Sequence, residues 1–478
     1  MLFNSIDFAI FLPLVFVLYW FVTNKHLKLQ NLLIVVASYV FYAWWDWRFL
    51  SLIVFSTLVD YTVGLYLGKE TSKNKRKALL WTSIIVNLGF LGFFKYYNFF
   101  LDNFVTAFSF FGYPISARSL NIILPVGISF YTFQTLSYSI DVYRKKLEPT
   151  KDLIAFAAFV SFFPQLVAGP IERATNLLPQ FYKKRSFKYH QAVDGLRQIL
   201  WGLFKKMVIA DNCAVFVNTI FDNHQDYSGS TLVLGAVFFA FQIYGDFSGY
   251  SDIAIGTARL FGFNLMQNFA FPYFSRDIAE FWRRWHISLS TWFRDYLYIP
   301  LGGSRGTKSK VIRNVFIIFI VSGFWHGANW TFIVWGALNA IYFLPLLLAN
   351  KNRNHLEVVA FNKKWPSIKA LLNILLTFGL TTLAWIFFRA ENINHAFQYL
   401  KGIFNKSLFS MPEIRPTNIL VLLIVFIAME WLGRRNQYAI ETFGLQWKRP
   451  LRLAFYYTII ILIFLFSRNE KTFIYFQF

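Results

Sequence analysis

The amino-acid sequence predicts an all-helical protein that crosses a membrane many times. Hydrophobic residues make up 56% of the 478 residues and charged residues only 15%, which is far from the composition of soluble domains. Apolar runs recur from residue 8 to residue 467 without a long polar stretch between them. We therefore expect a single membrane domain over residues 1–478 and no separate soluble domain.

The apolar runs predict about twelve transmembrane helices. A hydrocarbon core of ~30 Å needs ~20 helical residues. On this criterion the spans are expected at residues 7–22, 31–44, 49–68, 79–98, 122–140, 198–221, 231–246, 311–325, 330–348, 370–388, 418–432 and 452–467. Pro or Gly interrupts two further apolar stretches, 153–170 and 252–273. We expect both to be re-entrant or interfacial, because a broken backbone at membrane depth must be buried in protein or line a cavity.

The distribution of basic residues predicts how the chain is oriented. Of the 47 Lys and Arg residues, 34 fall in alternate loops, at 24–30, 69–78, 141–152, 171–195, 274–313, 349–369 and 433–452. The positive-inside rule places these loops in the cytoplasm and both termini outside. The basic residues of these cytoplasmic loops account for most of the formal charge of +23, and we expect no nucleic-acid partner.

Several chemistries have no support in the sequence. The chain has one cysteine, Cys213, which excludes an internal disulfide and a multi-cysteine metal site. No cluster of His, Cys and carboxylate residues has the spacing of metal ligands, and no Walker or Rossmann spacing occurs. We therefore predict no metal and no nucleotide hydrolysis.

A single histidine interrupts the apolar stretch VSGFWHGANWTFIVWG, residues 321–336. The helix before it rises only ~22 Å from the cytoplasmic face, so His326 is expected inside the protein at membrane depth, ringed by Phe324, Trp325 and Trp330. Because burial of an ionisable group in a membrane is costly, such a residue is a functional candidate. Desolvation favours the neutral imidazole, which can accept a proton from a hydroxyl. A hydrogen-bonded structural histidine is the alternative.

A second histidine lies in RDIAEFWRRWHISLSTWFRDYLYIPLGG, residues 276–303. Eight apolar side chains there fit one helical stripe: Ile278, Phe281, Trp282, Trp285, Leu289, Trp292, Phe293 and Tyr296. We expect a helix within 274–303 that lies in the membrane interface, with His286 at the edge of the stripe and Arg283 and Arg284 on the other side. A plain interfacial helix without a catalytic role is the alternative.

Two glycine-containing stretches carry polar residues near the presumed cytoplasmic surface. SFFPQLVAGPIER, residues 161–173, contains Gln165 and Glu172, and QIYGDFSGYSDIAIG, residues 242–256, contains Asp246 and Asp252. Gly permits tight turns and close approach to a ligand. We expect the carboxylates to cap loops rather than to bind a metal.

Together these motifs, with the opening MLFNSIDFAIFLPLVFVLYW, resemble the membrane-bound O-acyltransferase family, and within it the membrane subunits of bacterial alginate-type polysaccharide O-acetyltransferases. The resemblance runs over nearly the whole chain. It implies a central funnel through the bilayer, with His326 as the catalytic residue at its neck and His286 as a second one.

The resemblance also implies substrates and a location. The acyl donor is expected to be acetyl-CoA, with no permanently bound cofactor, and the acceptor an extracytoplasmic polysaccharide or a partner acetyltransferase of the SGNH type. The protein is expected in the cytoplasmic membrane of a bacterium. The residues expected to contact substrate are Asn329, Trp325, Arg283, Arg284 and Gln165.

Two other functions remain open at this point. Subunits that transfer D-alanyl groups to teichoic acid from a carrier protein resemble the chain in the same motifs. A subunit that exports polysaccharide without catalysis is the second alternative, although the absence of internal repeats and the dense aromatic content favour a narrow acyl path over a wide wet pore.

Overall fold

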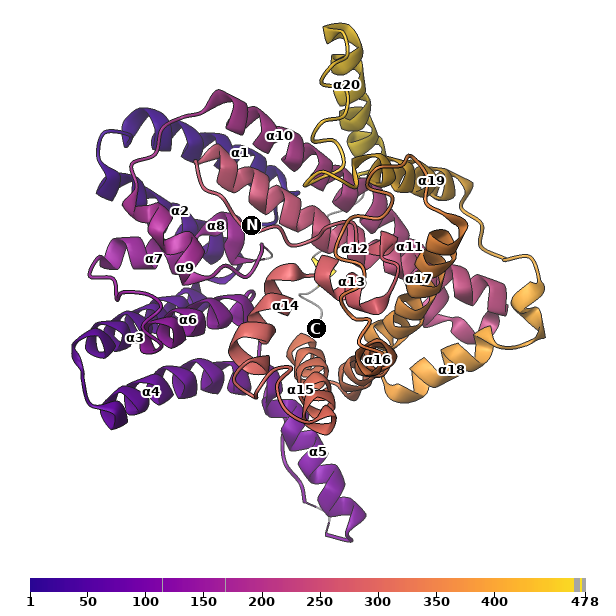
Figure 1. Cartoon of the computed structure of the whole chain (residues 1–478), viewed down its shortest axis with the longest axis horizontal. Coiled ribbons are helices and arrows are strands. Elements are labelled where there is room, and N and C mark those ends of the chain that lie inside the picture. Colours follow the sequence, from indigo (N-terminus) through magenta and orange to yellow (C-terminus); the bar gives the residue numbers. More distant parts are fainter. Residues whose placement is uncertain (114, 168, 468–472, 475–478) are drawn as a thin grey trace. The chain divides into compact units, whose positions relative to one another are not determined.

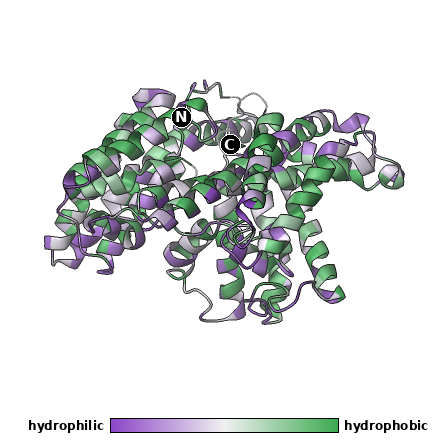
Figure 2. Cartoon of the chain, turned by 90° about the horizontal axis from the view of Figure 1, so that it is seen from above, coloured by the Kyte–Doolittle hydropathy of each residue, from purple (hydrophilic) through white to green (hydrophobic). Residues whose placement is uncertain are grey.

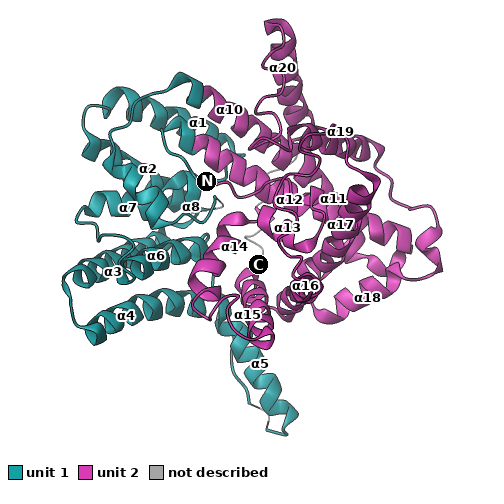
Figure 3. Ribbon diagram, viewed as in Figure 1, with its two compact units in different colours: residues 1–192, 258–265 teal, residues 193–257, 266–478 magenta. Residues whose placement is uncertain are grey.

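The computed structural model describes residues 1–113, 115–167, 169–467 and 473–474, and within these ranges the regular structure is helical, with no β-strand. The chain divides into two compact units (Figure 3). Unit 1 comprises Met1–Ala192 and Ala258–Leu265, and unit 2 comprises Val193–Thr257 and Met266–Phe478. Each unit is described by itself.

Unit 1 contains helices α1 to α9 (Figure 1). They are α1 (Ile6–Val17), α2 (Leu27–Asp46), α3 (Leu50–Lys69), α4 (Lys73–Leu91), α5 (Tyr97–Phe110), α6 (Ile128–Tyr143), α7 (Leu153–Ser161), α8 (Phe163–Leu166) and α9 (Ala174–Leu177). The helical path continues from α1 as a π-helical segment over Leu18–Val22. The stretch 153–170 is broken between α7 and α8, where Phe162 leaves the helical conformation just before Pro164, as the sequence predicts.

Polar side chains join three helices inside unit 1. The carboxylate of Asp60 on α3 is fully buried and accepts hydrogen bonds from Ser83 and Asn87 on α4 and from Ser139 on α6. Hydrogen bonds of this kind hold helices together where lipid removes the hydrophobic driving force for association. This network fixes α3, α4 and α6 in register.

Unit 2 contains most of α10 and the helices that follow it. They are α10 (Tyr189–Leu203), α11 (Asp211–Asp222), α12 (Gly229–Leu260), α13 (Ile278–Arg284), α14 (Ile287–Phe293), α15 (Lys308–His326), α16 (Trp330–Leu348), α17 (Ile368–Arg389), α18 (Ile393–Ile403), α19 (Thr417–Gly433) and α20 (Arg449–Phe466). A π-helical segment, Phe204–Ala210, joins α10 to α11.

Helix α12 corrects the prediction that the stretch 252–273 separates from the span 231–246. The helix is continuous to Leu260, because its glycines serve helix packing rather than chain breaks. A Cβ on Gly256 would lie 2.5 Å from the carbonyl oxygen of Gly195, and one on Gly202 would lie 2.6 Å from that of Gly249. Small residues thus let α10 and α12 approach closely, as in other membrane helix pairs.

Ion pairs within unit 2 correct the prediction that Asp246 and Asp252 cap loops. Both carboxylates lie on α12 and are buried. The ammonium of Lys206 lies 2.7 Å from Asp246 and 2.8 Å from Asp211, and that of Lys205 lies 2.5 Å from Asp252. Because a buried charge is tolerated only with a partner, these pairs tie the π-helical segment to α12.

Six helical segments of the described chain are long and apolar enough to cross a membrane: Leu27–Lys69, Lys73–Phe110, Gly229–Leu260, Trp330–Leu348, Ile368–Arg389 and Arg449–Phe466. Three apolar segments are shorter: Ile6–Val22, Leu153–Leu166 and Thr417–Gly433. Hydrophobic residues dominate the helices and hydrophilic residues gather in loops and at helix ends (Figure 2). The chain is therefore a multi-pass helical membrane protein, while the count of twelve spans stays a prediction.

Candidate active site

His326 is the last residue of α15 and its side chain is buried. It is 3% exposed, and its imidazole meets three rings: Trp325 at 4.8 Å between ring centroids, Trp335 at 5.2 Å and Phe388 at 5.4 Å. The predicted burial beside Trp325 is confirmed. Trp330, also expected beside the imidazole, is 53% exposed, so Trp335 on α16 and Phe388 on α17 supply the rest of the apolar enclosure.

Two glycines bring α15 and α16 together at this site. A Cβ on Gly323 would collide with the backbone carbonyl of Phe332, and a Cβ on Gly336 would collide with that of Phe319. The backbones are therefore in contact just before the turn that carries His326. The sequence VSGFWHGANWTFIVWG thus forms a tight helical hairpin.

The position of His326 at the end of α15 has an electrostatic effect. The carbonyl groups at the C-terminus of a helix carry a partial negative charge, which stabilises a nearby cation by 0.3–2 kcal/mol, roughly, depending on burial. His326 is uncharged when its imidazole can accept a proton and positive afterwards. Helix α15 therefore favours the protonated product of such a transfer.

His286 corrects the prediction of one continuous interfacial helix. The helix is broken between α13 and α14, and His286 itself adopts a left-handed conformation with φ of 45°. The backbone N–H of Ala270 donates to the carbonyl of Arg284, and the N–H of Ile287 donates to that of Asn268. These bonds to a distant segment replace the bonds that a continuous helix would make.

The break directs His286 into the interior of unit 2 rather than to the helix edge. The residue is 1% exposed, and its ring lies 4.6 Å from that of Phe247 and 6.3 Å from the imidazole of His326, measured between centroids. The two histidines are therefore brought together, as a shared site requires.

The imidazole of His286 is neutral and has unused polar atoms. Among the residues that the structure describes, neither ring nitrogen has a hydrogen-bond partner. Burial lowers the pKa of His286 from 6.5 to about 3, because the cation would lose its hydration. An unsatisfied buried polar group costs about 1–3 kcal/mol. The unbonded ring nitrogens of His286 therefore favour a functional role over a purely structural one.

Asn268, rather than His286, caps the N-terminus of α14. An N-cap side chain normally accepts a bond from the first N–H groups of its helix, but the imidazole does not. Instead the side-chain oxygen of Asn268 accepts bonds from the hydroxyl of Ser288 at 2.8 Å and its N–H at 3.3 Å, while its amide donates to Ser251. Asn268 is fully buried, and no local sequence pattern predicts this contact.

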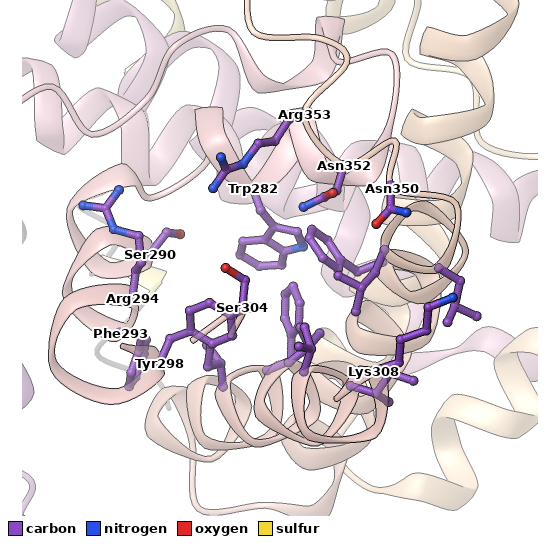
Figure 4. A pocket seen from close by; sticks show the side chains of 18 of the residues that line it. Trp282, Ser290, Phe293, Arg294, Tyr298, Ser304, Lys308, Asn350, Asn352 and Arg353 are labelled. Carbon is purple, nitrogen blue, oxygen red and sulfur yellow. The ribbon is translucent and has the colours of Figure 1, made fainter. Parts of the chain in front are cut away.

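A cavity of 530 Å³ lies in unit 2 between the α13–α14 region and helices α15 and α16. Its wall is mostly apolar and includes Trp282 and Ser322. Lys308 and Arg353 supply positive charge, whereas Arg294, also in the wall, pairs with Asp295 at 2.7 Å. Arg294 and Lys308 lie on opposite sides, with Trp282 between them (Figure 4). Ser322 is four residues before His326 on α15, one turn away, so the cavity approaches the buried histidines from one side.

Arg283 and Arg284 do not line this cavity. Arg283 donates to the carbonyls of Asn352 and His355, and Arg284 pairs with the buried carboxylate of Glu280 at 2.9 Å and donates to the carbonyl of Glu357. Because these partners occupy the guanidinium groups, the structure favours a structural role for both: they hold the loop that contributes Asn352 and Arg353 to the cavity wall.

Asn329 is also engaged in holding the fold. Its side-chain oxygen caps α16 by accepting a bond from the N–H of Thr331, and its amide donates to the carbonyl of Glu391. This arrangement favours capping over the expected contact with substrate.

Gln165 belongs to unit 1, on α8, and is described apart from the histidines. Its side chain is fully buried, and neither of its polar atoms has a hydrogen-bond partner among the described residues. No group of three or more His, Cys, Asp or Glu side chains able to hold a metal ion occurs in the described part of the chain.

Known proteins resemble this chain over most of its length. The family model for membrane-bound O-acyltransferases matches residues 5–388. The probable alginate O-acetylase AlgI of Pseudomonas aeruginosa is 39% identical over 446 residues, which are 92% of this chain and 82% of that protein. The peptidoglycan O-acetyltransferase of Helicobacter pylori is 38% identical over 433 residues, covering 84% of this chain and 80% of that protein.

A third relative is named for a different activity. The teichoic acid D-alanyltransferase of Bacillus subtilis is 27% identical over 289 residues, covering 58% of this chain and 71% of that protein. The family match and the acetyltransferase relatives, together with the helical architecture, describe a membrane-embedded acyltransferase. The chain belongs to the membrane-bound O-acyltransferase family.

Proposed function

We propose that this acyltransferase moves an acetyl group from cytoplasmic acetyl-CoA across the membrane, for O-acetylation of a polysaccharide outside the cytoplasmic membrane of a bacterium. The observation that carries the proposal is the pair of buried imidazoles, His286 and His326, with ring centroids 6.3 Å apart. A neutral imidazole in an apolar enclosure is suited to deprotonate a hydroxyl group.

His326 acts as the general base in this proposal. Its neutral imidazole takes the proton of an acceptor hydroxyl while the hydroxyl oxygen attacks the thioester carbonyl carbon. The new C–O bond forms, the C–S bond breaks, and the proton passes from the imidazolium to the departing thiolate of coenzyme A. The C-terminus of α15 stabilises the transient imidazolium.

His286 stabilises the negative charge that develops on the carbonyl oxygen. Its neutral ring has one N–H donor, and neither nitrogen is bonded to a described residue. A preorganised donor in a water-excluded site typically contributes about 10²–10³ to the rate. His286 thereby positions the donor without taking up the transferred proton.

The cavity beside α15 provides the route for the donor. Its apolar wall suits the pantetheine arm, and Lys308 and Arg353 supply positive charge that attracts the phosphates of coenzyme A. The indole of Trp325, in contact with both imidazoles, forms an apolar wall for the acetyl group. Coenzyme A is a substrate here, and the proposal includes no permanently bound cofactor.

The coverage of the relatives favours acetyl over D-alanyl transfer. The two acetyltransferases match 92% and 84% of this chain at 38–39% identity, whereas the D-alanyltransferase matches 58% at 27%. The names of the two acetyltransferases point to a polysaccharide acceptor, reached directly or through a partner acetyltransferase of the SGNH type.

Substitution of His326 tests this function. Transfer of labelled acetyl from acetyl-CoA into polymer should fall by about 100-fold or more in both His326→Ala and His326→Gln, the usual scale for a positioned base. Each variant is normalised to protein extracted as a monodisperse species. Retention of most activity by His326→Gln would show that the residue is a core histidine. Transfer from a D-alanyl carrier protein, but not from acetyl-CoA, would establish the alternative donor.

A further inference from the structure

We propose that unit 1 carries a binding site for an anionic phospholipid, in a groove between the end of the first helical run and the segment 184–187. The groove has a volume of 380 Å³, and its lining includes Phe16, Trp20, Phe187, Lys25, Lys184 and Arg185. It is made from residues of unit 1 alone, and the proposal does not depend on the acyl-transfer mechanism.

The apolar wall of the groove is held in place by aromatic contacts. The ring of Phe187 packs edge-on against Phe16 and Trp20, with centroids 5.9 and 5.6 Å apart. The indole N–H of Trp20 donates to the carbonyl of Leu260 at 2.9 Å, which fixes that ring. Phe187 nevertheless stays 49% exposed, so this wall has apolar surface left to cover, as acyl chains would.

The rim of the groove has one sign of charge. Two exposed lysines, Lys25 and Lys184, line the groove. Three more exposed lysines lie within three residues of its lining in the sequence: Lys28, Lys183 and Lys188. The segments 18–30 and 179–192, which carry them, contain no Asp or Glu. Basic residues at the end of an apolar helix lie at the headgroup level, where each one near the surface strengthens attraction to anionic lipid by about 1 kcal/mol.

Arg185 makes the groove a built site rather than a patch of surface charge. Its side chain is 92% buried, since it is 8% exposed, and its guanidinium lies 4.8 Å from the centre of the Phe263 ring. It donates hydrogen bonds to the side-chain oxygens of Asn31 and Gln30 and to the carbonyl of Gln180, and it also interacts with Tyr19; none of these partners is an Asp or Glu. Its Nε has no hydrogen-bond partner among the described residues.

A buried guanidinium with only neutral partners retains its attraction for an anion. Arg is suited to phosphate because its planar donors match the phosphate oxygens. The combination of this cation, the lysine rim and an apolar wall at the end of a membrane helix selects a ligand that has both a phosphate and acyl chains. We therefore assign the groove to an anionic phospholipid rather than to a soluble phosphate.

The test compares lipids on the purified full-length protein. Phosphatidylglycerol should raise Tm in mixed micelles and stay bound in native mass spectrometry, whereas phosphatidylcholine and inorganic phosphate should do neither. The double variant Lys25→Gln/Lys184→Gln should bind phosphatidylglycerol roughly 30-fold more weakly. Phe187→Ala should also weaken binding, although it changes no charge.

The matched control is Lys73→Gln/Lys77→Gln, which removes the same charge from exposed positions of unit 1 outside the groove lining. It should leave phosphatidylglycerol binding within about 3-fold of wild type, the scale of screened charges at a distance. An equal loss of phosphatidylglycerol binding in both double variants would show that the lipid is held by general surface charge and not by this groove. Stabilisation by inorganic phosphate alone, or equal binding of phosphatidylcholine, would overturn the assignment to an anionic phospholipid.

Discussion

The imidazole rings of His286 and His326 lie with their centroids 6.3 Å apart, although one residue sits in a break between two short helices and the other ends a long one. The break is what allows the approach, because a continuous helix would leave His286 at the edge of the apolar stripe. The two residues have different surroundings and hence different expected roles.

Replacement of His286 by Ala should lower the rate of acetyl transfer by about 100-fold, the lower end of the effect of removing one oxyanion donor. The loss should be smaller than that in His326→Ala, because His286 donates a hydrogen bond but does not take up the proton. The measurement is acetyl transfer at saturating and at limiting acetyl-CoA. A loss as large as that in His326→Ala would show that the roles are assigned wrongly.

The free energy of unfolding should fall as the pH falls below about 6.5, which is the ordinary pKa of a His side chain. The pKa of His286 is lowered in the folded state to about 3, so protons bind preferentially to the unfolded state in this range. Loss of this one group's contribution amounts to about 2 kcal/mol at pH 5. Tm measured at pH 7 and pH 5 should therefore differ less in His286→Gln than in wild type, and an unchanged difference would contradict the neutral assignment.

Asn268→Ala should reduce acetyl transfer by about 10-fold or more, because the cap of α14 is lost and the left-handed backbone of His286 is no longer held. Asn268→Asp keeps the acceptor for Ser288 and should retain more activity than the Ala variant. The readout is kcat together with KM, measured on protein of unchanged Tm. If the additional variant His286→Ala/Asn268→Ala were 10-fold less active than His286→Ala, Asn268 would act through something other than His286.

Lys308→Gln/Arg353→Gln should raise KM for acetyl-CoA by about 10-fold with little change in kcat, because two charges on the cavity wall attract the donor phosphates. The effect should shrink at high salt. Lys369→Gln, at an exposed position outside the cavity lining, is the control. A fall in kcat at unchanged KM would place these residues elsewhere in the reaction.

The helical architecture follows from the sequence because apolar runs of sufficient length can satisfy their backbone only as helices in lipid. Each predicted span coincides with helix over most of its length, for example 330–348 with α16. The prediction failed at 252–273, where Gly256 was interpreted as a chain break. Its actual use, close contact with Gly195, depends on a partner helix that no local pattern reveals.

The site was predictable in its chemistry and not in its geometry. The apolar surroundings of His326 are a local property, and the spacing of four residues could have identified Ser322 on the same face of α15. The break at His286 depends on backbone hydrogen bonds with Asn268 and Ala270, which lie outside α13 and α14. Likewise the charge of Arg283 is evident from its identity, but its engagement by the carbonyls of Asn352 and His355 is not.

The buried ion pairs of unit 2 also constrain how the chain is inserted during synthesis. Lys205 and Lys206 leave the ribosome before their partners Asp252 and Asp246 on α12. A helix that carried these charges into lipid alone would meet a large penalty, which pairing removes. The buried pairs therefore favour joint insertion of α12 and the predicted span 198–221, because each segment supplies the partner charges of the other. A Lys206→Leu variant would keep the Lys205–Asp252 pair but remove the cation that Lys206 provides to both Asp211 and Asp246.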